Sequence, residues 1–195
     1  MISPLEHSIV ISPIGELDPL LIKAIGKSIT ESFGFGTENV CLLEDINFAL
    51  DSERDQYYST AILDRLSELA PPQAIKLLAV CQVDLFIPIL THVYGEAQLG
   101  GKACIVSTLR LIEDLPSPNT SRICAQRIIK EAIHELGHTF KLRHCQDTSC
   151  GMHYCRTIKD VDHKSHEFCR YCKILLQDEI KRIRKKGTGD YHTSI

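Results

Sequence analysis

Residues 134–144 of this chain read HELGHTFKLRH, and this stretch decides the fold. His134 and His138 are four residues apart, so on a helix their imidazoles point the same way and can meet at one metal ion. Glu135 lies on an adjacent direction, from which its carboxylate can reach a water without being a ligand. His144 follows six residues after His138, where a chain that reverses after the helix would bring it back to the same point.

Three imidazoles and one open position are the ligand set of a catalytic zinc site. The bare HExxH pattern also occurs by chance, as two solvated histidines on a helix surface. His144 argues against this alternative, and so does Met152, which lies in a turn-like context and is the only methionine besides the initiator. The stretch therefore predicts a zinc-dependent peptidase in which Glu135 is the general base.

The composition, with 44% hydrophobic and 24% charged residues in a chain of 195, is typical of a globular protein with one good core. A net charge of -3 gives no reason to expect nucleic acid or a membrane surface as a partner. No apolar stretch is long enough to span a bilayer, and the first residues lack the features of a signal peptide. We therefore expect a cytoplasmic protein, and a monomer.

Apolar periodicity predicts strands and helices that alternate along the first two thirds of the chain. Strands are expected over residues 7–14, 40–43, 84–90 and 103–107, and helices over 20–33 and 58–69. A long helix over 122–140 would carry the first two histidines, and a final helix is expected over 169–183. This order predicts an α/β (α+β) fold with a mixed twisted sheet, packed helices, a long active-site helix and a small C-terminal part stapled by zinc.

Nine cysteines are many for a reducing compartment, and their odd number argues against a disulfide framework. Four lie in scattered apolar surroundings and are interpreted as small buried hydrophobes: Cys41, Cys81, Cys104 and Cys124. The other five are clustered between residues 145 and 172. Such clustering indicates a specific role.

Two cysteine pairs within this cluster have the spacing of a structural zinc site. The pairs are Cys145 with Cys150, and Cys169 with Cys172. Four thiolates make a closed site that could stabilise a C-terminal part too small to build its own core. Cys155 competes for a place in this site, and His163 and His166 are weaker competitors.

The chain resembles the metzincin clan of zinc peptidases, whose long motif is HExxHxxGxxH followed by a Met-turn. It is more closely similar to the archaemetzincin family. There the third histidine is followed directly by a cysteine, then by a second cysteine, a methionine and a distant CxxC. The matching residues here are His144, Cys145, Cys150, Met152, Cys169 and Cys172. Residues 94–97 and 100–101 look like the edge region of the upper sheet in that family.

The resemblance implies that the three histidines of residues 134–144 bind a catalytic zinc, with Glu135 as general base. It implies that Met152 forms a hydrophobic floor beneath this metal. It also favours Cys145 and Cys150 over Cys155 as partners of the CxxC pair. Two zinc ions per chain are therefore expected.

The resemblance further implies a cleft between two subdomains of a single domain that spans residues 1–195. The larger subdomain would be residues 1–140 and the smaller one residues 141–195. An edge strand of the sheet would hold an extended peptide or unfolded protein in this cleft by β-augmentation. The expected activity is that of a metalloendopeptidase or an aminopeptidase-like enzyme.

Lys141 departs from the family pattern, because it occupies the position of the metzincin glycine. Glycine suits that position since the chain must turn sharply there, often with a positive φ. A lysine in this conformation costs roughly 1 kcal/mol, which a folded protein can absorb. Lys141 could also bring a cation near the cleft. The alternative function is therefore a weak or inactive zinc-stabilised peptide-binding protein.

Tyr154 follows Met152 by two residues, as in the Met-turns of astacin-like and serralysin-like metzincins. That tyrosine approaches the metal and helps to stabilise the transition state, so Tyr154 is a candidate oxyanion donor. The other interpretation is a packed turn tyrosine. A further class of function, a redox or metal-handling protein, would require Cys169 and Cys172 to be free and reactive.

Overall fold

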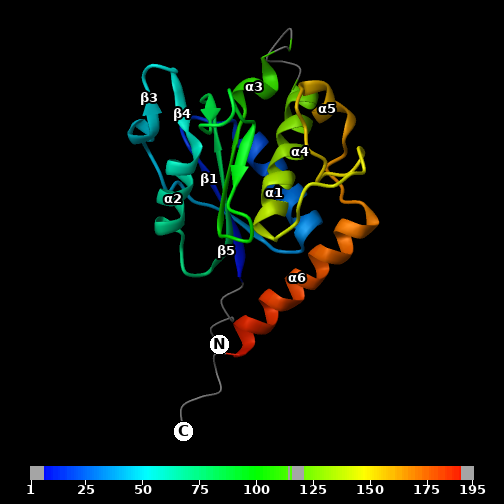
Figure 1. The fold of residues 1–195 in the computed structure, drawn as a ribbon. Coiled ribbons are helices and arrows are strands. Elements are labelled where there is room, and N and C mark those ends of the chain that lie inside the picture. Colours follow the sequence, from blue (N-terminus) through cyan, green and yellow to red (C-terminus); the bar gives the residue numbers. More distant parts are fainter. Residues whose placement is uncertain (1–6, 114, 116–120, 190–195) are drawn as a thin grey trace.

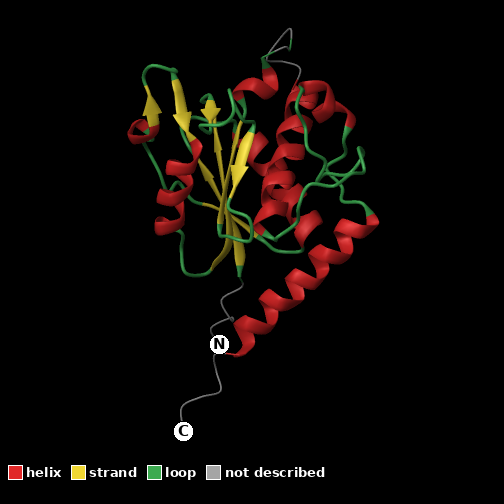
Figure 2. Ribbon diagram, in the orientation of Figure 1, coloured by secondary structure: helices red, strands yellow, loops and turns green. Residues whose placement is uncertain are grey.

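The computed structural model describes residues 7–113, 115 and 121–189, without the side chains of residues 121 and 186–189. Figures 1 and 2 show a twisted sheet with helices on both of its faces. The helices are α1 (Pro19–Phe33), α2 (Ser59–Leu69), α3 (Leu109–Ile112), α4 (Ser121–Thr139), α5 (Ile158–His163) and α6 (Arg170–Gly189). Among the described helices, none has both the length and the apolar composition that crossing a membrane requires.

The main sheet has five strands in the order β2-β1-β5-β8-β7. They are β1 (Ser8–Pro13), β2 (Thr37–Asn39), β5 (Ala74–Cys81), β7 (Gly95–Ala97) and β8 (Ala103–Ser107). Four of them run parallel, whereas β7 runs antiparallel to β8 at the end of the order. A smaller sheet, in the order β3-β4-β6, consists of β3 (Leu50–Asp51), β4 (Gln56–Tyr58) and β6 (Leu85–Phe86). The predicted mixed α/β architecture is confirmed.

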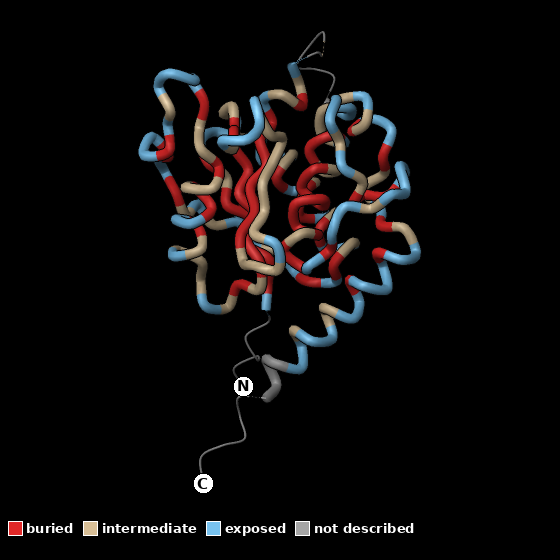
Figure 3. The backbone as a smooth tube through the Cα atoms, in the orientation of Figure 1, coloured by how far each residue is buried: buried red, intermediate tan, exposed pale blue. Residues whose placement is uncertain are grey.

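Alternate side chains of the central strands enter two cores, one on each face of the sheet. On one face Leu78 and Val106 pack with α1 and α4, and on the other Leu77 and Ile105 pack against α2. Figure 3 shows the central strands as the buried middle of the molecule. Burial on both faces explains why β5 is continuously apolar from residue 77 to residue 81 instead of alternating with polar residues.

The predicted helices agree closely with the structure. Residues 20–33, 58–69 and 122–140 correspond to α1, α2 and α4, each to within one residue at either end. Helix α1 begins where the Asp18 side chain accepts a hydrogen bond from Leu20 N (2.8 Å), and it ends at Gly34 with φ 70°. The final helix, expected over 169–183, is α6 and extends to Gly189.

Two predicted strands differ from the structure, and three strands were not expected. Two of these are the short strands β3 and β4. The third is β5, the centre of the sheet, whose apolar run over residues 77–81 lacks the period of two that identifies a half-buried strand. The short strand expected over 40–43 lies earlier, as β2, since Leu42 N bonds the side chain of Ser12 instead of a strand backbone. Only Leu85–Phe86 of residues 84–90 is strand, because a turn follows in which Leu90 N bonds Ile87 O.

A buried lysine fixes the end of α4 to the sheet. Lys76, on β5, donates from Nζ to Thr139 O (2.6 Å) and to Gly101 O (2.7 Å). Thr139 is the last residue of α4, so the ammonium group satisfies a carbonyl at the helix end, where a positive charge is also favourable. Burial lowers the pKa of Lys76 to about 8. The end of the helix is therefore held at a fixed height over the sheet.

Candidate active site and metal centres

Helix α4 and the turn after it bring the three predicted histidines together. His134 and His138 lie in the last two turns of the helix, and their Nε2 atoms are 3.1 Å apart. One ring nitrogen from each of His134, His138 and His144 lies within 4.8 Å of the other two. Two Zn–N bonds of about 2.0–2.1 Å at a tetrahedral angle would place nitrogens about 3.3 Å apart. The spacing therefore suits one zinc ion.

Backbone carbonyls determine which nitrogens of these rings are available. His134 Nδ1 lies 2.8 Å from Gly151 O, and His138 Nδ1 lies 2.8 Å from Leu142 O. A carbonyl only accepts, so both Nδ1 atoms carry hydrogen and both Nε2 atoms are left with a lone pair. Two lone pairs 3.1 Å apart repel each other unless a cation lies between them. Burial lowers the pKa of His134 and of His144, and it lowers the pKa of His138 to about 4. The three imidazoles are therefore neutral at neutral pH, and none has to lose a proton when a metal binds.

Lys141 has the positive φ that the sequence predicts at the reversal. Its φ is 66°, and the turn is closed by Lys141 N to His138 O (2.9 Å) and Leu142 N to Gly137 O (3.0 Å). The lysine side chain pairs with Glu179 on α6, with Nζ 2.8 Å from Oε1. The ammonium group is therefore directed to α6, and Lys141 is not among the residues that line the cleft.

Met152 lies buried against the active-site helix. A Cβ at Gly137, between the two histidines of α4, would collide with Met152 Sδ and approach its Cε to 3.2 Å. The turn that carries Met152 is tied to the third histidine, because Cys145 N donates to Met152 O (2.9 Å). Gly137 is thus required for the close approach of Met152 to α4.

The four predicted cysteines form a second cluster next to the histidines. The sulfurs of Cys145, Cys150, Cys169 and Cys172 all lie within 4.8 Å of one another. The Sγ atoms of Cys145 and Cys169 are 3.8 Å apart, far longer than the roughly 2.05 Å of a disulfide and close to the separation of two thiolates on one zinc.

Hydrogen bonds and burial act in opposite directions on the protonation of these cysteines. Cys150 Sγ accepts from Cys169 N (3.2 Å) and from Met152 N (3.5 Å), which favours a thiolate. Burial raises the pKa of Cys150 and of Cys172, whereas a hydrogen bond from the backbone of Cys172 lowers that of Cys169. Among the described residues, Cys155, His163 and His166 are not part of the group.

The histidines open onto a cleft with a volume of about 870 Å³. One wall comes from residues 87–99, and the other from α4 and residues 143–156. Strand β7 lies so close to α4 that a Cβ at Gly95 would come within 2.7 Å of Glu135 Cγ. Burial raises the pKa of Glu135 well above its usual value, and the nearby Glu131 adds to this effect. A carboxyl group with a raised pKa beside a metal site is typical of a proton-transfer group.

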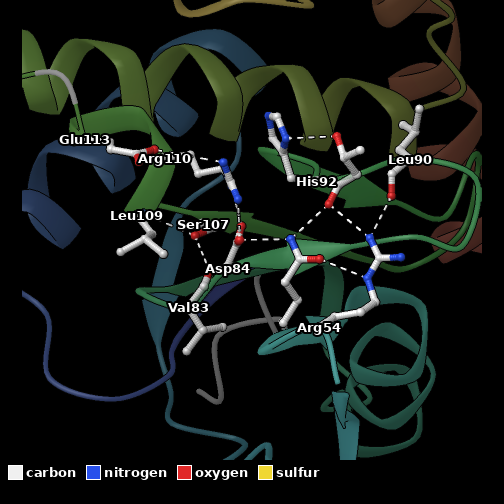
Figure 4. A network of polar contacts seen from close by, with 11 residues as sticks. Arg54, Val83, Asp84, Leu90, His92, Ser107, Leu109, Arg110 and Glu113 are labelled. Carbon is white, nitrogen blue, oxygen red and sulfur yellow. Dashed lines mark hydrogen bonds and ion pairs between the residues drawn. The ribbon is translucent and has the colours of Figure 1, made fainter. Parts of the chain in front are cut away.

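A polar network holds the lip of this cleft, which we define as residues 87–94. Figure 4 shows Arg54 below the lip, where its Nη2 donates to Leu90 O (3.2 Å) and Thr91 O (3.1 Å). The Gln56 side chain joins Thr91 O to Asp84, and Asp84 pairs with Arg110 at 2.6 Å. The bonds from Arg54 and Gln56 end on backbone carbonyls of the lip, so they position its main chain and do not depend on its side chains.

A buried ion pair supports the cleft behind the histidines, and sequence reasoning missed it. Lys164 Nζ lies 2.8 Å from Glu131 Oε1, and both side chains are at most 4% exposed. Burial alone would lower the pKa of Lys164, but the Glu131 carboxylate, together with Cys155 and Glu135, raises this pKa above its usual value. Glu131 was detectable, since it precedes Glu135 by one helical turn. Lys164 offered no such signal, because only the fold brings it to α4.

Tyr154 is exposed at the cleft and not packed in a turn. It is 42% exposed, and its ring lies 4.8 Å from that of His144 between centroids. The same cleft is lined by Tyr94 and Arg156, which were not singled out as site residues from the sequence, and by Cys155, which was considered only for the cysteine site. All three would have been found only by knowing which loops meet over α4.

These features together are those of a zinc metallopeptidase. Two histidines lie on one helix and a third on the turn that follows, a buried glutamate lies beside them, and the cysteines form a separate cluster. The chain belongs to the archaemetzincins. The family model described as Peptidase family M54 matches residues 38–178.

Relatives and solved structures agree with this assignment. The archaemetzincin of Methanopyrus kandleri is 39% identical over 134 residues, which are 69% of this chain and 73% of that protein. The archaemetzincin of Methanocaldococcus jannaschii is 34% identical over 171 residues, 87% of this chain and 93% of that protein. The crystal structure of the Methanopyrus kandleri protein superposes with a TM-score of 0.78 at 31% identity, covering 93% of this chain and 100% of that one. An Archaeoglobus fulgidus archaemetzincin complexed with malonate has a TM-score of 0.70 at 30% identity, covering 86% and 99%.

Proposed function

We propose that this protein hydrolyses peptide bonds, with a catalytic zinc on His134, His138 and His144 and a structural zinc on the four clustered cysteines. The observation that carries the proposal is the pair of facing Nε2 atoms, 3.1 Å apart, whose Nδ1 partners are both backbone carbonyls. Such a pair fits a cation and leaves the cleft side open. Zinc supplies a Lewis acid there, and it activates water as a nucleophile at neutral pH.

Glu135 is the general base in this proposal. Its carboxylate takes a proton from the attacking water and later delivers it to the leaving amine. Its burial beside β7 keeps bulk water away and raises its affinity for that proton. Tyr154 donates its hydroxyl hydrogen to the developing oxyanion in this proposal, and its exposed ring beside His144 in the same cleft supports this role. Met152 packs beneath the histidines and fixes the turn behind them.

Extended peptides or unfolded segments are the proposed substrates. Strand β7 is at the end of the sheet, and Gly95 and Ala97 line the cleft beside Glu135. A peptide that adds to this edge would pass directly over the histidines. In this proposal the cleft separates residues 1–140 from residues 141–195. The wall of residues 87–99 belongs to the first part and residues 143–156 belong to the second, while α4, at the end of the first part, contributes the remaining lining residues.

Two other functions are less well supported. A peptide-binding protein without activity was suggested by Lys141, but this side chain is engaged by Glu179 on α6 and does not enter the cleft. A redox protein would need Cys169 and Cys172 to be free, whereas their sulfurs share one compact group with Cys145 and Cys150. A thiol titration of the folded, zinc-loaded protein tests the redox function, which requires reactive thiols.

The experiment that tests the proposal is hydrolysis of a diverse quenched-fluorescent peptide library by zinc-loaded protein. We expect cleavage by the wild type and a loss of about 10²–10⁴-fold in Glu135→Gln, the range for removal of a general base. Glu113→Gln, at an exposed glutamate outside the cleft, is the matched control. Absence of cleavage by fully zinc-loaded wild type would contradict the proposal and favour the peptide-binding function.

A further inference from the structure

We infer that the wall of the cleft beside His144 is a subsite for a carboxylate of the peptide substrate, formed by Arg143 and Arg156. The inference rests on the proposed function and specifies its substrate class. A carboxylate can come from an Asp or Glu side chain near the scissile bond, or from the C-terminus of the peptide. Both sources present the same planar group to a guanidinium, which matches it with two parallel hydrogen bonds.

Both arginines lie on the same wall as the third histidine. Arg143 directly precedes His144, and both residues line the cleft. Arg156 has its Cζ 6.0 Å from the centre of the Tyr154 ring, and that ring lies 4.8 Å from the His144 ring. These contacts, from His144 through Tyr154 to Arg156, place a guanidinium on the same wall of the cleft as the third histidine. Both arginines are exposed, so a ligand can reach them.

Neither of these two arginines has an acidic partner among the described residues. Three other basic groups around α4 do: Lys164 pairs with Glu131, Arg127 with Asp162, and Lys141 with Glu179. Within the described part of the chain, no carboxylate forms an ion pair with Arg143 or Arg156.

The acidic groups nearest to the arginines are already engaged. Of the two carboxylates that line the cleft, Glu131 is held by Lys164, and Glu135 lies buried beside β7. The carboxylate of Asp160 lies near the backbone of Arg156, where it accepts from Arg156 N, Thr157 N and Thr157 Oγ1 in the capping box of α5. The wall therefore presents two cations to the cleft.

The other wall has a different chemistry. Its lining residues from 87 to 99 are apolar or uncharged apart from His92, and burial lowers the pKa of His92, so that it is neutral at neutral pH. Ile87, Leu90 and Leu99 are among them, and Leu99 is 55% exposed. Because charge is confined to one wall, the two arginines favour peptides that carry a carboxylate at the matching position. They also favour the one direction of the bound peptide that brings this carboxylate to their wall.

Binding to the zinc-loaded Glu135→Gln protein tests the subsite without turnover. The probes are fluorescent peptides of one sequence in which a single Glu is moved position by position, each paired with its Gln counterpart. Every peptide is made with a free and with an amidated C-terminus. We expect at least one Glu peptide, or the free-acid form, to bind about tenfold more tightly than its neutral counterpart at low salt. A preference for Glu over Gln identifies a side chain as the source of the carboxylate, and a preference for the free over the amidated form identifies the C-terminus.

The double variant Arg143→Gln/Arg156→Gln should bring this ratio close to one, and so should high salt. Arg65→Gln, which removes the same charge from the surface of α2, should leave the ratio unchanged. Three results would each overturn the inference. The parent protein could bind all peptides equally, the preference for the carboxylate could survive in the double variant, or Arg65→Gln could lose this preference to the same extent as the double variant. Absence of cleavage by wild type would instead overturn the proposed function, since the binding ratio is measured without hydrolysis.

Discussion

The histidine cluster and the cysteine cluster are joined by one peptide bond, between His144 and Cys145, yet they differ in almost every physical respect. The histidines open onto a cleft, and their pKa values are lowered by burial, so they are neutral and ready to bind. The cysteines offer four sulfurs to one ion, which leaves no position for a substrate. The open site depends on neighbouring residues to keep its three histidines in position. For His144 the cysteine cluster can do so, because Cys145 is the next residue in the chain.

The largest effect is expected from breaking the closed site. Cys169→Ser should remove the structural zinc and destabilise the C-terminal part by several kcal/mol, since metal binding and folding are coupled in such sites. We also expect at least a tenfold loss of kcat/KM, because Cys145 N holds the turn of Met152 and Cys145 adjoins His144. Zinc content per chain, denaturation and peptide hydrolysis measure these effects.

The control for this variant is Cys41→Ser, which changes an exposed thiol outside the four-sulfur group and outside the cleft. The reverse experiment, His138→Ala, should abolish the catalytic zinc and leave one zinc on the cysteines. Full activity in Cys169→Ser would show that the two clusters are independent.

A smaller effect is expected from the ion pair behind the open site. Lys164→Met leaves Glu131, which is 4% exposed, buried without its partner, and this should cost about 3–5 kcal/mol in the free energy of unfolding. The double variant Glu131→Leu/Lys164→Met should recover most of this loss. Urea denaturation of zinc-loaded proteins gives both values. If the single and double variants were equally unstable, packing and not charge would be the function of the pair.

The smallest effect is expected at Lys141. Lys141→Gly relieves backbone strain of about 1 kcal/mol, but it removes an ion pair of at most about 1 kcal/mol and makes the unfolded chain more flexible. These terms nearly cancel, so we expect unfolding free energy to change by less than about 1 kcal/mol and kcat/KM by less than threefold. Lys141→Ala keeps the strain and loses the ion pair, so it should be the less stable of the two. An increase in activity of tenfold or more in Lys141→Gly would show that the lysine damps the enzyme.

The sequence predicted which histidines and cysteines come together far better than it predicted the sheet. His134, His138 and the CxxC pair could be found because a metal imposes fixed spacings on neighbouring residues. Strand β5 was missed because a strand buried on both faces has no alternation to reveal it. Lys164 and Arg156 were missed for another reason. Contacts between distant segments bring Lys164 to α4 and Arg156 to the cleft, and no local pattern marks such residues. Arg143 directly precedes His144, but the zinc-binding motif leaves its position unspecified.

The positive φ of Lys141 bears on how relatives of this protein are recognised. A pattern that demands glycine three residues after the second histidine describes a residue, whereas the fold requires only a left-handed backbone at that point. Here a lysine meets the requirement, and a glutamate 38 residues later in the chain holds its side chain. A pattern that also accepts a lysine when α6 supplies an acidic partner would retain chains that the strict glycine rule discards.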